Sequence, residues 1–158
     1  MKFTFIMVGK LKESFYGDGI GTYLKRLSKY GECRLIMIDE SKSSNSQSAI
    51  EQKRGLEEEA SHVLNKIEDG SCVIAFDTKG ELCDSVEFSK LIFESPIAKN
   101  HTYFVIGGSN GLSDLIRHRA DARIKISEMT FVHPLAMLVA VEQVYRAARI
   151  YYHEPYHK

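Results

Sequence analysis

The sequence has 158 residues, of which 44% are hydrophobic and 27% charged, a composition typical of a single globular domain and not of a disordered chain. The formal net charge is zero, so overall charge gives no argument for nucleic-acid binding. Three cysteines, Cys33, Cys72 and Cys83, have no metal-like spacing and predict reduced thiols in a cytoplasmic protein without a metal site. The apolar runs are too short for a signal peptide or a membrane span, so we expect neither export nor membrane insertion.

Strand-like and helical segments alternate along the chain. Strands are predicted at residues 2–8, 33–39, 72–77, 102–107 and 122–127, and helices at 12–30, 50–67, 84–95, 111–119 and 133–150. The last helix should begin near Pro134, because proline fits a first helical turn. The serine-rich segment 39–48 is interpreted as a polar loop. This order predicts one α/β domain over residues 1–158, with a mainly parallel sheet flanked by helices.

The strongest local motif is FVIGGSNGLS, residues 104–113, in which an apolar strand leads into three glycines and then a helix. Glycine lets the backbone take positive φ and lets a ligand approach closely, and ligands of α/β proteins bind at the carboxyl ends of strands. A tight turn without a ligand is the alternative. The motif matches neither the P-loop nor the dinucleotide-binding pattern.

The same stretch also reads as G-x-S-x-G, the nucleophile elbow of serine hydrolases, with Ser109 as nucleophile. An acid and a histidine follow in the required order, namely Asp114 or Asp121 and then His133 or His157. The chain is short for that fold and lacks an upstream HGGG-type element, so a hydrolase is the lesser alternative.

Two further segments suggest a site. The loop KISEMTFVHP, residues 125–134, follows a strand and could flank the same pocket as the glycines. On the last helix, residues 135–141 are apolar all round, which predicts burial by the core and by a partner subunit. Glu142, Arg146 and Arg149 then form one polar stripe that leads toward the closing EPYHK.

Several of these motifs together are specific. FVIGGSNGL, MTF followed by HP, EQVYRA and PYHK, with VGKLKE and YLKRL near the N-terminus, resemble the RlmH family of SPOUT methyltransferases over essentially the whole chain. The resemblance implies a trefoil-knotted α/β fold and a homodimer with the C-terminal helix in its interface. It also implies S-adenosyl-L-methionine as cofactor, and methylation of N3 of a pseudouridine in helix 69 of large-subunit ribosomal RNA in the assembled ribosome.

Site residues are carried over from the resemblance by position. The cofactor site would comprise Phe76, Gly107, Gly108, Ile126, Ser127, Glu128, Met129, Thr130 and Phe131. The catalytic and RNA-facing groups would be Glu142, Arg146, Tyr156 and His157, with Lys158 nearby. Methyl transfer to an imide nitrogen needs positioning and removal of the N3 proton, for which His157 is a suitable base. Arg146 would stabilise negative charge on the base, and Tyr156 would stack on it or hydrogen-bond it.

The chain departs from the family at four positions. Tyr152 and His153 stand where arginine and glycine are usual, Met137 where an arginine is common, and Val132 where a proline is usual. The lost positive charges would weaken contacts with RNA phosphates. A diverged paralogue with another RNA target, or a non-catalytic ribosome-binding protein, is therefore the main alternative.

Overall fold

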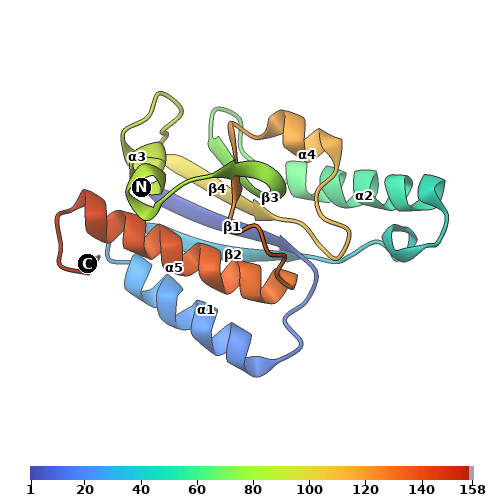
Figure 1. Ribbon diagram of the computed structural model, residues 1–158, viewed down its shortest axis with the longest axis horizontal. Helices are drawn as coiled ribbons and strands as arrows, with labels where there is room; N and C mark the ends of the chain where they lie inside the picture. The colour runs from blue at the N-terminus through green and yellow to red at the C-terminus, as the bar shows by residue number, and fades with distance from the viewer. Residues whose placement is uncertain (157–158) are drawn as a thin grey trace.

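The computed structural model describes residues 1–156, which form one five-stranded sheet with helices on both faces (Figure 1). The strand order is β2-β1-β4-β3-β5, and every neighbouring pair is parallel. The elements, in chain order, are β1 (Lys2–Val8), α1 (Ser14–Leu27), β2 (Glu32–Ile38), the 3-10 helix η1 (Lys42–Asn45), α2 (Ala49–Leu64), β3 (Cys72–Leu82), α3 (Ser85–Phe93), β4 (His101–Ile106), α4 (Asp114–Arg119), β5 (Ala122–Lys125) and α5 (His133–Tyr151). The predicted α/β class with a parallel sheet is confirmed.

Alternation along the buried strands divides the core into two layers. In β1, Phe3, Phe5 and Met7 pack with α1, α3 and α5, whereas Ile6 and Val8 pack with α2 and α4. Figure 1 shows α2 and α4 on one side of the sheet and α1 and α5 on the other. Because both faces are covered, the central strands read as continuous apolar runs, as parallel strands do.

The element boundaries differ from the prediction at functionally relevant places. β3 continues beyond Asp77 to Leu82, because the chain bulges out after Phe76 and rejoins the sheet, where Glu81 pairs with Ile124 of β5. α4 begins at Asp114 and not at 111, because the glycine turn occupies the preceding residues. The serine-rich segment contains the short helix η1.

The apolar start of the C-terminal helix α5 is partly buried by its own chain. Met137 is fully buried in the core between the sheet and α1 and α3. Met137, which stands where an arginine is common in the family, is therefore a core residue in this chain. Within residues 1–156 no helix is both long and apolar enough to cross a membrane. The trefoil knot and the dimer interface on α5 stay predictions.

Candidate active site

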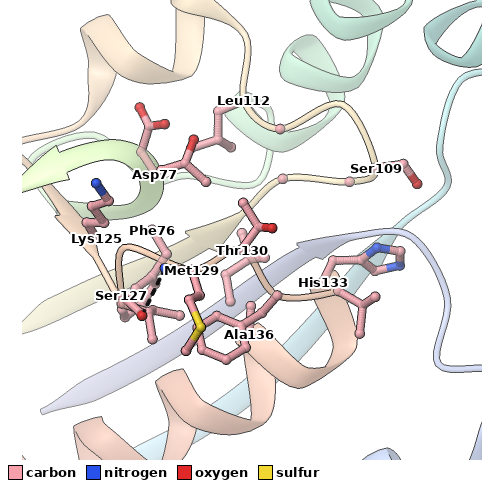
Figure 2. A pocket seen from close by; sticks show the side chains of 18 residues that line it. Phe76, Asp77, Ser109, Leu112, Lys125, Ser127, Met129, Thr130, His133 and Ala136 are labelled. Atoms are coloured by element: carbon pink, nitrogen blue, oxygen red, sulfur yellow. Dashed lines mark hydrogen bonds between the residues drawn. The ribbon is translucent and has the colours of Figure 1, made fainter.

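A cavity of about 610 Å³ opens at the bulge of β3 after Phe76 and at the carboxyl ends of β4 and β5 (Figure 2). Its volume lies within the range of small-molecule sites. The residues expected from the resemblance that line it are Phe76, Gly107, Gly108, Ile126, Ser127, Met129, Thr130 and Phe131. Glu128 does not line it; the Glu128 carboxylate pairs with Lys125 Nζ at 2.6 Å. Two loops that are distant in sequence therefore form the two walls of one hollow.

Each glycine of the wall after β4 has a reason within the fold. A Cβ at Gly107 would collide with the carbonyl of Gly111, and Gly111 itself has a φ of +77°. The turn is closed by a hydrogen bond from Gly111 N–H to Gly108 O at 3.0 Å. A Cβ at Gly108 would lie 2.5 Å from Glu40 Oε1. The glycines thus shape a tight turn, and this turn also forms one wall of the cavity.

The opposite wall, residues 126–132, carries an exposed apolar rim. Met129, Phe131 and Val132 are 74%, 37% and 61% exposed, values unusual for such side chains. The turn within this wall is held by Ser127 Oγ, which accepts a hydrogen bond from Met129 N–H at 3.1 Å (Figure 2). An apolar rim around a cavity indicates a surface that a ligand or a second chain covers.

The C-terminal polar residues form one cluster, as expected. Glu142 Oε1 accepts hydrogen bonds from Arg146 at 2.6 Å and from Tyr156 Oη at 3.1 Å. The Arg146 guanidinium lies over the Tyr156 ring, with its central carbon 4.7 Å from the ring centre, and Tyr145 packs edge-on against the same ring. His157 lies outside the described residues.

The surroundings of Tyr156 and Arg146 keep both groups protonated near neutral pH. Burial, followed by the neighbouring Tyr23 and Glu142, raises the pKa of Tyr156 above its ordinary value. The hydrogen bond to Glu142 raises the pKa of Arg146. Near neutral pH the phenol is therefore protonated and donates to Glu142, while Arg146 is charged. Tyr156 is thus suited to positioning and donation, and proton removal must come from another group.

The segment after α5 is docked on its own chain. Glu154 contacts Lys29 Nζ at 2.8 Å, Tyr30 Oη at 2.8 Å and Arg149 Nε at 3.0 Å. Tyr152 stacks on Tyr30 with ring centres 5.1 Å apart. Burial and the Glu154 carboxylate raise the pKa of Tyr30 to about 12, so its phenol remains a donor. Tyr152, one of the departures from the family, therefore has a packing role here.

The cavity and the C-terminal cluster lie at different points along α5. Ala136, near the start of the helix, lines the cavity, while Glu142 and Arg146 lie about 9 and 15 Å further along the helix axis. None of the three described cluster residues lines the cavity. Within one chain, the two halves of the expected site are therefore not brought together.

The structure adds three cavity residues that were not among the positions expected to bind the cofactor. Asp77 lines the cavity with its side chain 2% exposed and pairs with Arg117 Nε at 2.8 Å. Lys125 and His133 also line it, and His133 is the first residue of α5. Asp77 and Lys125 stand at carboxyl ends of predicted strands, and that position is the signal by which they could have been found.

The hydrolase alternative finds no support in the geometry. The Ser109 hydroxyl donates to Glu40 Oε1 at 2.8 Å. Asp114 and Asp121 pair with arginines of α4. Within the described part of the chain, no histidine is hydrogen-bonded to Ser109, the contact that activates such a nucleophile.

Fold and cavity together define a class, the α/β proteins that bind a small ligand at the carboxyl edge of a parallel sheet. The family described as "Predicted SPOUT methyltransferase" matches residues 1–157. The chain belongs to the SPOUT methyltransferase family. This match confirms the resemblance seen in the sequence.

Individual relatives agree with this assignment. The chain is 43% identical to "Ribosomal RNA large subunit methyltransferase H" of Clostridium acetobutylicum over 159 residues, covering 100% of both. It is 45% identical to the protein of the same name from Clostridium botulinum strain 657, again covering 100% of both. A solved probable methylase family protein from Haemophilus influenzae Rd KW20 shares the fold, with a TM-score of 0.53 and 13% identity over 99% of this chain and 70% of that one.

Proposed function

We propose that this protein is a ribosomal RNA methyltransferase of the large subunit. S-adenosyl-L-methionine is the methyl donor, and N3 of a pseudouridine in helix 69, within the assembled ribosome, is the acceptor. The observation that carries the proposal is the cavity beside the glycine turn, lined by eight of the nine positions that the family resemblance assigns to the cofactor. The names of relatives at 43–45% identity support the ribosomal RNA substrate. Methylation of assembled ribosomes would take place in the cytoplasm.

The cavity fits the chemistry of the donor. Ile106, Leu112 and Ala136 offer apolar surface for a purine ring, and backbone groups of the glycine turn are available for its polar edge. Asp77 and Thr130 provide polar atoms for hydroxyl or amine groups. When bound, the donor supplies an electrophilic methyl group on a sulfonium.

The C-terminal cluster fits the acceptor side of the reaction. Arg146 is held by Glu142, so its guanidinium is oriented before substrate arrives and can stabilise negative charge on the pyrimidine oxygens. Tyr156 offers an aromatic face and a protonated hydroxyl to the base. His157 takes the N3 proton in this proposal, because Tyr156 is already protonated near neutral pH.

The separation of cavity and cluster supports a homodimer. The two are about 9 Å or more apart along α5, whereas methyl transfer requires the reacting atoms within roughly 3.5 Å. In the proposed dimer, the C-terminal cluster of one subunit completes the cavity of the other. The exposed apolar rim at Met129, Phe131 and Val132 supports such covering.

The test is transfer of labelled methyl from S-adenosyl-L-methionine to ribosomes from a strain that lacks the resident helix 69 methyltransferase, with free ribosomal RNA in parallel. Label on the helix 69 pseudouridine of whole ribosomes is the expected result. Label on a different nucleotide would indicate a diverged paralogue. If neither substrate is labelled, the remaining interpretation is a ribosome-binding protein that does not methylate RNA.

One variant and one control test whether the Tyr156 hydroxyl takes part in the reaction. Tyr156→Phe removes the hydroxyl that donates to Glu142 and is expected to lower kcat about tenfold while S-adenosyl-L-methionine still binds. Lys53→Ala in the surface helix α2 is the control and should behave as wild type. Unchanged kcat in Tyr156→Phe would remove this hydroxyl from the mechanism.

A further inference from the structure

The glycine turn is held from outside the cavity by a carboxylate that follows β2. Glu40 Oε1 accepts hydrogen bonds from Ser109 N–H at 2.7 Å and from Ser109 Oγ at 2.8 Å. Glu40 does not line the cavity; it lines two neighbouring hollows behind the glycine turn. Neither the sequence motifs nor the proposed chemistry gives this residue a role.

The close packing at this contact is specific. A Cβ at Gly108 would lie 2.5 Å from Glu40 Oε1, so any side chain at this position would displace the carboxylate. A second attachment lies beside the first, because the Asn110 amide donates to the carbonyl of Ser44 and, at 3.3 Å, to Asn45 Oδ1. Residues 40–45, here called the clamp segment, thus hold the glycine turn at two points.

The clamp segment is itself fixed on α2. Ser41 N–H donates to the buried carboxylate of Glu59 at 2.8 Å, and Ser41 Oγ donates to Glu58 at 2.7 Å. Gly55 of α2 lies so close to the backbone of Ser44 that no side chain would fit between them. An anchored helix therefore supports the clamp segment, and the clamp segment supports the turn.

We propose that Glu40 is a positioning residue for cofactor binding. This inference rests on the proposed function of the cavity. Gly107, Gly108 and Gly111 give the turn unusual backbone freedom, and ordering that backbone costs entropy each time a ligand binds. Glu40 holds the turn in the shape that forms the cavity wall before the ligand arrives. Preorganisation of this kind raises affinity without any direct contact with the ligand.

The test is titration calorimetry of S-adenosyl-L-methionine with the purified full chain, because binding is measured without any RNA substrate. Glu40→Ala removes both hydrogen bonds and is expected to raise Kd about tenfold, since bonds to a charged acceptor are among the stronger ones. Glu40→Gln keeps the reach and an acceptor oxygen, so Kd should stay within about threefold of wild type. Glu40→Asp keeps the charge but not the reach, and Kd should rise about tenfold.

A matched control and a second readout separate positioning from general destabilisation. Glu57→Ala changes an exposed glutamate of α2 that takes no part in the contacts described above, and its Kd should equal that of wild type. At saturating S-adenosyl-L-methionine, kcat of Glu40→Ala should lie within about twofold of wild type, so that only the cofactor KM changes.

The outcomes distinguish the two proposals. If wild type binds S-adenosyl-L-methionine and Glu40→Ala binds it equally well, Glu40 is not a positioning residue, while the proposed function stands. If Glu40→Asp binds well and Glu40→Gln poorly, the charge acts directly and positioning is refuted; these two variants also decide the matter if Glu40→Ala does not fold. If wild type does not bind S-adenosyl-L-methionine, the proposed function fails and the positioning role with it.

Discussion

Replacing His153 by glycine should stabilise the protein, because His153 holds a left-handed backbone conformation that glycine adopts more readily than other residues. It follows the end of α5 with a φ of 53°. Its N–H bonds to Ile150 O at 3.0 Å, and Glu154 N–H bonds to Arg149 O at 2.9 Å, which is the pattern of a Schellman motif. Glycine is the usual residue at this position of the motif.

The expected gain is a difference between two opposing effects. A left-handed conformation costs an L-residue about 1–2 kcal/mol, which glycine does not incur. The greater freedom of glycine in the unfolded chain costs about 0.5–1 kcal/mol. His153→Gly should therefore raise the free energy of unfolding by about 0.5–1 kcal/mol, and Tm by about 1–4 °C for a chain of this length.

The assay is thermal and urea unfolding at one fixed chain concentration, so that any self-association affects all variants equally. His153→Ala is the matched control: it removes the imidazole but keeps Cβ, and it should be no more stable than wild type. His153→Asn should lie between alanine and glycine, because asparagine tolerates positive φ. An alanine variant as stable as the glycine variant would show that the imidazole, and not the backbone conformation, sets the stability.

Three further predictions concern substitutions of the buried residues Met137 and Asp77. Met137→Ala should lower the free energy of unfolding by about 2–5 kcal/mol, whereas Met137→Leu should cost under about 1.5 kcal/mol, as urea unfolding would show. Although burial acts to raise it, hydrogen bonds from Arg117 and from the Lys79 backbone hold the pKa of Asp77 below its ordinary value. The ionised carboxylate therefore stabilises the fold above about pH 4, and this contribution is lost as pH falls through the folded-state pKa. The stability difference between wild type and Asp77→Asn should accordingly shrink in acid; a difference independent of pH would contradict the ion-pair explanation.

Much of the fold can be predicted from local sequence patterns. Apolar runs such as 2–8 and 102–107 give central strands, because both of their faces are covered. Pro134 correctly marks the first turn of α5. The return of β3 to the sheet at Glu81 is not predictable in this way, because its pairing with Ile124 depends on a partner more than forty positions away.

The residues of the candidate site likewise fall into those that local sequence predicts and those that depend on distant partners. The glycine turn is predictable because it follows a strand and ligands bind at that edge, whereas Phe76, which lies within β3, is assigned to the site by the family resemblance. The hydrogen bonds between Glu40 and Ser109 join residues 69 positions apart, so they appear only once β2 and β4 are placed in the sheet. Burial of Met137 in the core is predictable in the same local way, because it lies in a stretch of helix that is apolar all round.

Because α5 carries a cavity residue at its beginning and the C-terminal cluster near its end, a dimer of this chain would have two sites that each draw on both subunits. A subunit with a damaged cavity could then be complemented by one with a damaged C-terminal cluster. Equal mixing of two such inactive chains, followed by subunit exchange, would leave one intact site in every mixed dimer, and about a quarter of wild-type activity would return. The length of one helix would thus make each subunit dependent on the other for activity.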